Sequence, residues 1–157
     1  MKQSTKSMEP RRAARLFFRI GIVLVAANLF LGLEIHNGDT MEPTLQDGQL
    51  VFFKKERYSL NRGFPDQGDI VVVRPHAIPG LQEGSPIRRV AGLPGETVVI
   101  SDRVVELGPD EVFVTGDNLR MASERAEDSS AQIKLGDIKG SALVILWPLS
   151  DIGAVKK

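Results

Sequence analysis

Cysteine is absent from the 157 residues, and histidine occurs only twice, as His36 and His76. The chain therefore cannot form a disulfide framework or a cysteine-ligated metal site, and two histidines are too few for a histidine cluster. We expect no cofactor. The lack of cysteine fits either side of a membrane, so it does not indicate a compartment.

The chain is also too short for two domains, and it contains no internal repeat and no low-complexity segment. Once a basic tail and one apolar segment are set aside, about 120 residues remain, which suffice for one modest globular domain.

Net charge is lacking as well, but the formal value of zero hides an asymmetry. Residues 1–19 carry six basic side chains against Glu9, a charge of +5, so the rest of the chain sums to −5. The basic side chains are Lys2, Lys6, Arg11, Arg12, Arg15 and Arg19. A disordered basic tail for nucleic acid is one interpretation. Because the basic stretch leads directly into an apolar one, we favour a membrane anchor and expect no nucleic-acid partner.

The apolar stretch runs from Leu16 to Leu33, with only Arg19 and Asn28 strongly polar. As a helix it would be about 27 Å long, just enough to cross the hydrocarbon core of a bilayer. Arg19 lies one turn from its start, where the long side chain can reach the headgroups. The sequence predicts a cytoplasmic tail (1–15), a single transmembrane helix (16–33) and an extracytoplasmic domain (34–157), because basic residues flank the N-terminal side.

Two other interpretations of this segment remain open. A cleaved signal peptide needs small residues one and three places before its cleavage site, whereas Phe30, Leu31, Leu33 and Glu34 crowd the end of this one. A buried core helix is also possible, although the preceding arginines disfavour it.

After the apolar segment come short runs rich in β-branched and aromatic residues, each bounded by Gly, Pro, Asp or Asn. They are too short for helices. The runs are 49–53, 69–73, 87–91, 97–100, 111–115 and 142–147. They predict a mainly β domain with one or two sheets. Residues 122–135 are the one stretch that could form a short helix, and a loop is equally compatible.

Five segments follow one another in a characteristic order. Gly38–Leu45 (GDTMEPTL), followed by Asp47-Gly48, resembles the nucleophile box of bacterial signal peptidase I. The later segments resemble its Gly-Asp-Ile-Val strand, its general-base box, the start of its final box and its closing strand; they are 68–72, 87–96, 116–118 and 136–148. The resemblance covers about residues 16 to 148. It implies a β domain of the signal-peptidase-like and LexA-like kind behind the membrane helix.

Signal peptidases I cleave signal peptides by acyl transfer: a serine attacks the scissile carbonyl, and a neutral lysine takes the proton. By position, the resemblance puts Thr40 at the nucleophile and Arg88 at the base. The extra methyl of threonine crowds the approach to the carbonyl, which would slow the reaction. A guanidinium stays protonated and cannot accept a proton. The resemblance therefore implies a homologue of serine-type endopeptidases that has lost catalysis, a pseudoenzyme.

We expect Arg88 either to reach solvent or to pair with a carboxylate such as Glu96, Asp117 or Glu124. Another base is hard to find, because a lone histidine such as His36 or His76 is usually solvated or hydrogen-bonded.

The remaining motif residues are expected to shape the turn and the substrate groove. They are Gly38, Met41, Pro43, Arg89, Gly116, Asp117, Asn118 and Ser123. Arg89 matches the arginine of the family, and we expect a structural ion pair there. The final box departs from the usual pattern across residues 119–130, where Ser123 comes one place late and Ser130 replaces an arginine.

Phe52, Phe53, Phe64 and Trp147 could supply an apolar surface for the bilayer and an extended substrate, or they could fill a small core. The leading hypothesis is a non-catalytic signal-peptidase-like protein that binds a signal-peptide-bearing precursor, a pilin-type precursor or an active paralogue at the outer membrane face. The alternative is an active signal peptidase that uses Thr40 and an unidentified base. A self-cleaving repressor is disfavoured, because a membrane segment stands where such proteins have a DNA-binding domain.

Overall fold

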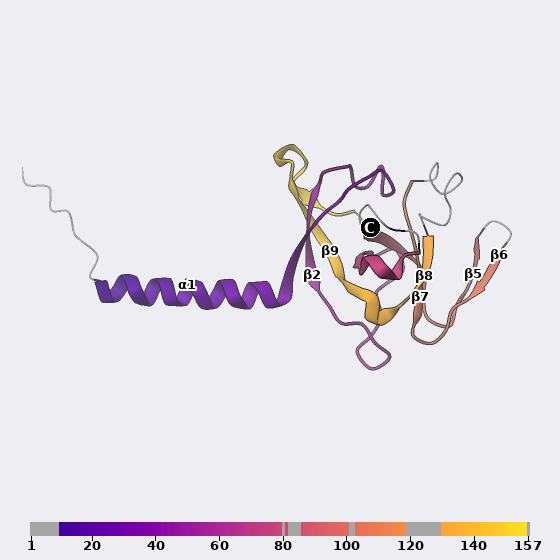
Figure 1. Ribbon diagram of the computed structural model, residues 1–157, viewed down its shortest axis with the longest axis horizontal. Helices are drawn as coiled ribbons and strands as arrows, with labels where there is room; N and C mark the ends of the chain where they lie inside the picture. Colours follow the sequence, from indigo (N-terminus) through magenta and orange to yellow (C-terminus); the bar gives the residue numbers. More distant parts are fainter. Residues whose placement is uncertain (1–9, 80, 82–85, 101–102, 119–129, 157) are drawn as a thin grey trace, which may run out of the picture. The chain divides into compact units, whose positions relative to one another are not determined.

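The computed structural model describes residues 10–79, 81, 86–100, 103–118 and 130–156 (Figure 1). The chain divides into two compact units, residues 1–31 and 32–157.

The first unit consists of the helix α1 (Pro10–Phe30). Large apolar side chains on α1 are exposed, among them Phe17, Phe18, Val25 and Leu29. The helix ends at Phe30 rather than at Leu33, because the last part of the expected segment begins the first strand. Within the described part of the chain, no helix combines the length and the apolar character that crossing a membrane requires.

The second unit is a mainly β domain, as the sequence predicts. Its strands are β1 (Leu31–Ile35), β2 (Leu50–Lys55), β3 (Ile70–Val73), β4 (Ile87–Gly92), β5 (Thr97–Ile100), β6 (Arg103–Glu106), β7 (Glu111–Thr115), β8 (Ser130–Lys134), β9 (Ile138–Trp147) and β10 (Gly153–Ala154). Three short 3₁₀ helices lie at Pro75–Ala77, Leu135–Asp137 and Leu149–Asp151.

An eight-stranded sheet forms the body of this domain, in the order β1-β2-β9-β3-β4-β7-β8, with β10 beside β9. The long strand β9 pairs antiparallel with β2, β3 and β10. Figure 1 shows β2 and β9 side by side. The strands β5 and β6 form a separate two-stranded hairpin. The fold is thus an antiparallel sheet in which β9 joins the two halves.

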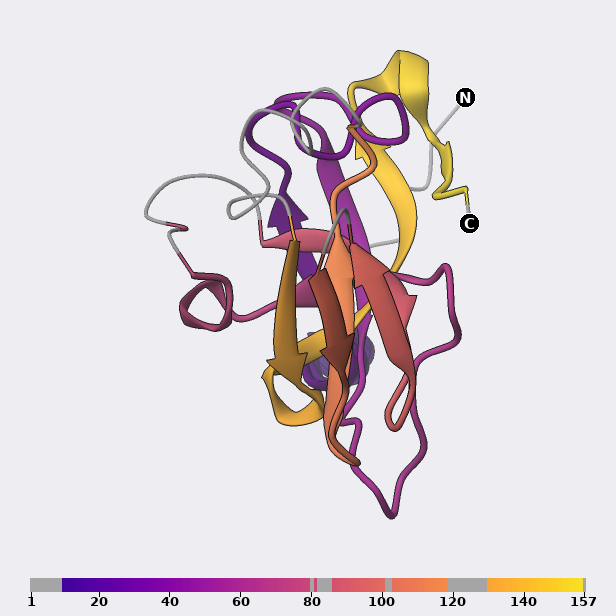
Figure 2. The ribbon, with the colours of Figure 1, turned by 90° about the vertical axis from the view of Figure 1, so that its right-hand side faces the viewer.

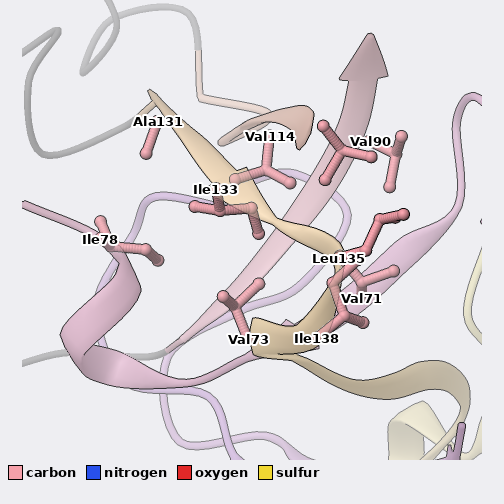
Figure 3. Packing of buried hydrophobic residues seen from close by; sticks show 10 residues of the cluster. Val71, Val73, Ile78, Val90, Val114, Ala131, Ile133, Leu135 and Ile138 are labelled. Atoms are coloured by element: carbon pink, nitrogen blue, oxygen red, sulfur yellow. The ribbon is translucent and has the colours of Figure 1, made fainter. Parts of the chain in front are cut away.

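The core lies on both sides of β3, whose four residues are all buried. Successive side chains of a strand point to opposite faces, so Val71 and Val73 enter one hydrophobic cluster while Ile70 and Val72 enter another. Figure 3 shows the first cluster, in which residues of β3, β4, β7 and β8 pack together. A strand buried on both faces explains why Ile70–Val73 is a continuous apolar run.

Two strands differ from the sequence expectations, and the aromatic residues divide between the two roles left open for them. The strand β9 begins at Ile138, four residues before the apolar run at 142. The strand β8 occupies 130–134, within the stretch for which a helix or a loop was expected, and residues 122–129 lie outside the described residues. Of the aromatic residues, Phe53 is buried, whereas Phe64 and Trp147 are exposed.

The loop between β1 and β2 (residues 36–49) and the segment after β9 gather at one end of the β domain, in purple and yellow in Figure 2. The side-chain amide of Gln49 donates to Asp151 Oδ2 over 2.8 Å, which ties the two segments together. Met41 and Leu45 are fully buried in the second cluster. These contacts fix residues 36–49 to the core.

Candidate active site

Thr40 lies in a tight turn that its own neighbours stabilise. The N–H of Gly38 donates to Asp47 Oδ1 over 2.7 Å, and Gly38 has a φ of +91°, which favours glycine. The N–H of Glu42 donates to the carbonyl of Asp39 over 3.1 Å. Pro43 follows through a cis peptide bond. The turn leaves Thr40 partly exposed while the next residue is buried.

The segment after β7 supports this turn from a distant part of the sequence. The N–H of Asn118 donates to the carbonyl of Thr40 over 3.1 Å, and its side-chain amide donates to the carbonyl of Asp39 over 2.8 Å. Gly116 packs so closely that a Cβ there would lie 2.4 Å from the Thr40 carbonyl oxygen. The Gly-Asp-Asn motif is therefore a support for the Thr40 turn.

Arg88, on β4, reaches the same place from the opposite side. Its side chain is buried, and Nη1 donates to the carbonyl of Ile87 over 2.7 Å and to Thr40 Oγ1 over 3.3 Å. The expectation that this guanidinium would reach solvent is thus wrong. Of the carboxylates considered as its partner, Asp117 pairs with Arg89, Glu96 accepts from the N–H of Leu93 over 2.8 Å, and Glu124 lies outside the described residues.

The direction of the hydrogen bond between Arg88 and Thr40 decides what the pair can do. The guanidinium donates and the hydroxyl oxygen accepts. A guanidinium so placed would stabilise an alkoxide, but it has no lone pair with which to remove the hydroxyl proton. The position of the base is therefore occupied by a proton donor.

His36 is a buried member of this site that the sequence did not reveal. It is fully buried, and within the described part of the chain neither ring nitrogen has a hydrogen-bond partner. Burial, followed by the positive charge of Arg88, lowers the pKa of His36 to about 4, while Asp47, the Gly38 backbone and Asp39 oppose the shift. Of the two expected environments, the solvated one is wrong for His36, because its side chain is fully buried. At neutral pH it is uncharged and a weak base.

The other histidine, His76, contacts a carboxylate. His76 Nε2 lies 3.3 Å from Asp137 Oδ1, and the His76 side chain is exposed. Across the described residues, no group of acidic and histidine side chains is arranged to hold a metal ion.

Arg89, next to Arg88 on β4, forms a partly buried polar network with the loop of residues 36–49. Its Nε and Nη2 each donate to one carboxylate oxygen of Asp117 over 2.7 Å, and Nη1 donates to the carbonyl of Gly68 over 2.7 Å. Thr44, from the nucleophile box, donates to Asp117 Oδ2 over 2.5 Å. The hydrogen bonds to Asp117 raise the pKa of Arg89, although burial opposes them.

This network joins three of the motifs recognised in the sequence. It connects the Pro-Thr-Leu of the nucleophile box, the second arginine of the base box and the Asp of Gly-Asp-Asn. The hydroxyl of Thr44 was not singled out beforehand, although its place in the motif was visible. Ser123, the remaining member of the predicted site, lies outside the described residues.

Comparison with known proteins agrees with this arrangement. The model of the family described as "Signal peptidase, peptidase S26" matches residues 11–145. The mitochondrial inner membrane protease subunit 1 of Homo sapiens is 30% identical over 135 residues, covering 80% of this chain and 75% of the relative. The same subunit of Mus musculus is 28% identical over 139 residues, with the same coverage. Signal peptidase I of Leptolyngbya laminosa is 31% identical over 145 residues, covering 73% of this chain and 68% of the relative. The chain therefore belongs to the signal peptidase family, peptidase S26.

Proposed function

We propose that this chain is a non-catalytic member of the signal peptidase family that binds precursor proteins without cleaving them. The observation that carries the proposal is the hydrogen bond from Arg88 Nη1 to Thr40 Oγ1. Acyl transfer by a hydroxyl needs a group that accepts its proton within hydrogen-bond reach. The side chain that occupies this position remains a cation at every physiological pH.

Among the described residues, the neutral nitrogen base near this site is His36, and it offers little help. The pKa of His36 is lowered to about 4, so its ring accepts a proton weakly at neutral pH. Within the described part of the chain, its nitrogens make no hydrogen bond to Thr40. These two facts support the non-catalytic proposal over an active peptidase with Thr40 as nucleophile.

The ligand class follows from the family. Its members act on signal-peptide-bearing precursors, and the supports of the groove region persist here: the buried Met41, the Arg89–Asp117 pair and the contact of Asn118 with Thr40. We propose that an extended segment of a signal-peptide or pilin-type precursor binds beside Thr40. The name of the mammalian relatives denotes one subunit of a protease, so binding to an active paralogue is a further candidate.

We further propose that residues 16–33 attach the chain to a lipid bilayer, with the N-terminus cytoplasmic and the β domain extracytoplasmic. The exposed apolar side chains on α1, such as Phe17, Phe18 and Leu29, support the attachment. The basic residues before and within the start of the helix support the orientation.

A cleavage assay tests the non-catalytic proposal. The purified full-length protein is incubated with a signal-peptide-bearing precursor and compared with Thr40→Ala and with the double variant Thr40→Ser plus Arg88→Lys. We expect no processing by the natural sequence and processing by the double variant, in which a hydroxyl and a titratable amine face each other again. The matched control is Thr40→Ala plus Arg88→Lys, which has the amine without a hydroxyl and should be inactive.

Processing by the natural sequence that disappears in Thr40→Ala would refute the proposal and establish the active alternative. Binding is measured separately, by fluorescence anisotropy of a labelled precursor peptide. No detectable binding together with no cleavage would remove the proposed function altogether.

A further inference from the structure

Thr40 and Arg88, at the positions of the family's nucleophile and base, are arranged in a way that suits ligand binding. The Arg88 guanidinium is 1% exposed, and its Nη1 lies 3.3 Å from Thr40 Oγ1. The Thr40 side chain is only half-buried. A permanent positive charge therefore lies directly behind the hydroxyl of a partly exposed residue.

The hydroxyl is also oriented by its neighbour. Because Thr40 Oγ1 accepts a hydrogen bond from Arg88, the proton of the hydroxyl is left to donate in another direction. The turn is held from the other side by Asn118 and by the close packing of Gly116, so Thr40 cannot swing away easily. A hydroxyl donor backed by a cation is a suitable partner for an oxygen anion.

The surroundings strengthen such an interaction. His36 is fully buried near Arg88, whose positive charge contributes to lowering the pKa of the imidazole. Both side chains are thus shielded from bulk water. Hydrogen bonds to ionised groups are stronger in such a dry environment than at an exposed surface.

The position of Thr40 indicates which group of a bound peptide would face its hydroxyl. In acyl transfer the nucleophile faces the carbonyl carbon at which the substrate is cut. A peptide in the same register that ends at this point carries its terminal carboxylate there, whereas an uncut precursor carries a neutral amide. We propose that Arg88 and Thr40 form a binding site for the free C-terminal carboxylate of an extended peptide, the group that a completed cleavage leaves behind.

This inference rests on the proposed function and narrows its ligand to chains that already end at the site. The inference also gives Arg88, which stands where the family has lysine, a role in binding the ligand. A neutral lysine would leave no charge behind the Thr40 hydroxyl, whereas arginine is always ionised.

Peptide binding to the purified full-length chain tests the inference. The probes are a labelled decapeptide ending in Ala-Gln-Ala with a free carboxylate, the same peptide with a C-terminal amide, and the same peptide extended by five residues. We expect the acid to bind at least about tenfold more tightly than the amide or the extended form. Arg88→Met should abolish this preference, and Thr40→Val should reduce it.

The matched control is Arg74→Met, which removes the same charge from an exposed position after β3 and should leave the preference intact. Equal binding of acid and amide by the natural sequence would overturn this inference while leaving peptide binding in place. Failure of all three peptides to bind would overturn the proposed function as well. If Arg88→Met does not fold, the comparison of acid with amide, together with Thr40→Val, still decides the outcome.

Discussion

Acidification should destabilise the β domain through His36, and the size of the effect can be worked from its environment. The pKa of His36 is about 4 in the folded chain, against 6.5 when the side chain is unperturbed. Between these two values the unfolded chain binds more protons than the folded one, so stability is complete above about pH 6.5 and is lost as the pH falls toward 4. The full effect is at most about 3 kcal/mol, and at pH 5 it is about 2 kcal/mol.

The assay is urea unfolding at pH 7.5 and at pH 5, followed by the fluorescence of the single tryptophan, Trp147, which lies on β9. Because other groups titrate in the same range, the measured quantity is the difference between the natural sequence and His36→Leu. We expect the variant to be at least as stable at pH 7.5, since it removes two buried ring nitrogens that lack partners among the described residues. At pH 5 its advantage should grow by about 2 kcal/mol.

His76→Leu is the control, because the exposed His76 should show no comparable gain. An advantage of His36→Leu that does not change between pH 7.5 and pH 5 would refute the reasoning, since it would mean that His36 titrates alike in the folded and unfolded chains.

Two further predictions concern the supports of the site. Asp117→Asn breaks the partly buried pair with Arg89 and should lower the free energy of unfolding by about 2–4 kcal/mol. A lysine cannot replace Arg89, because only a guanidinium can donate twice to the carboxylate. Urea unfolding measures this, and a loss below about 0.5 kcal/mol would contradict it. Gly116→Ala should cost about 1–3 kcal/mol, since the new methyl would lie 2.4 Å from the Thr40 carbonyl oxygen. Gly136→Ala, which meets nothing within 4 Å, should be tolerated, and equal costs for the two changes would argue against the packing explanation.

The buried strands could be predicted from the sequence because their residue types favour β-strands. Ile70–Val73 and Glu111–Thr115 are rich in β-branched residues, and both form strands close to the expected bounds. The strand β8 escaped notice because Ser130–Lys134 buries only two of its residues, which gives a weak pattern. The strand β1 was hidden inside an apolar run, whose composition alone cannot show where a helix ends and a strand begins.

The candidate site was predicted as a set of positions but not as a set of contacts. The motif order placed Thr40 and Arg88 together, and the structure puts their side chains 3.3 Å apart. The burial of His36 could not be foreseen, because it depends on how the loop of residues 36–49 folds over β4, a tertiary effect with no local signature.

The hydrogen bond between Gln49 and Asp151 has a practical consequence for work on this protein. It spans 102 positions of sequence, and the Lys156 carbonyl lies 3.4 Å from Arg89 Nη2 as well. The geometry around residue 40 is thus partly held by the final few residues of the chain. We therefore expect a deletion or an affinity tag at that end to disturb the Thr40 turn, so that a variant altered only there could weaken the proposed peptide binding indirectly.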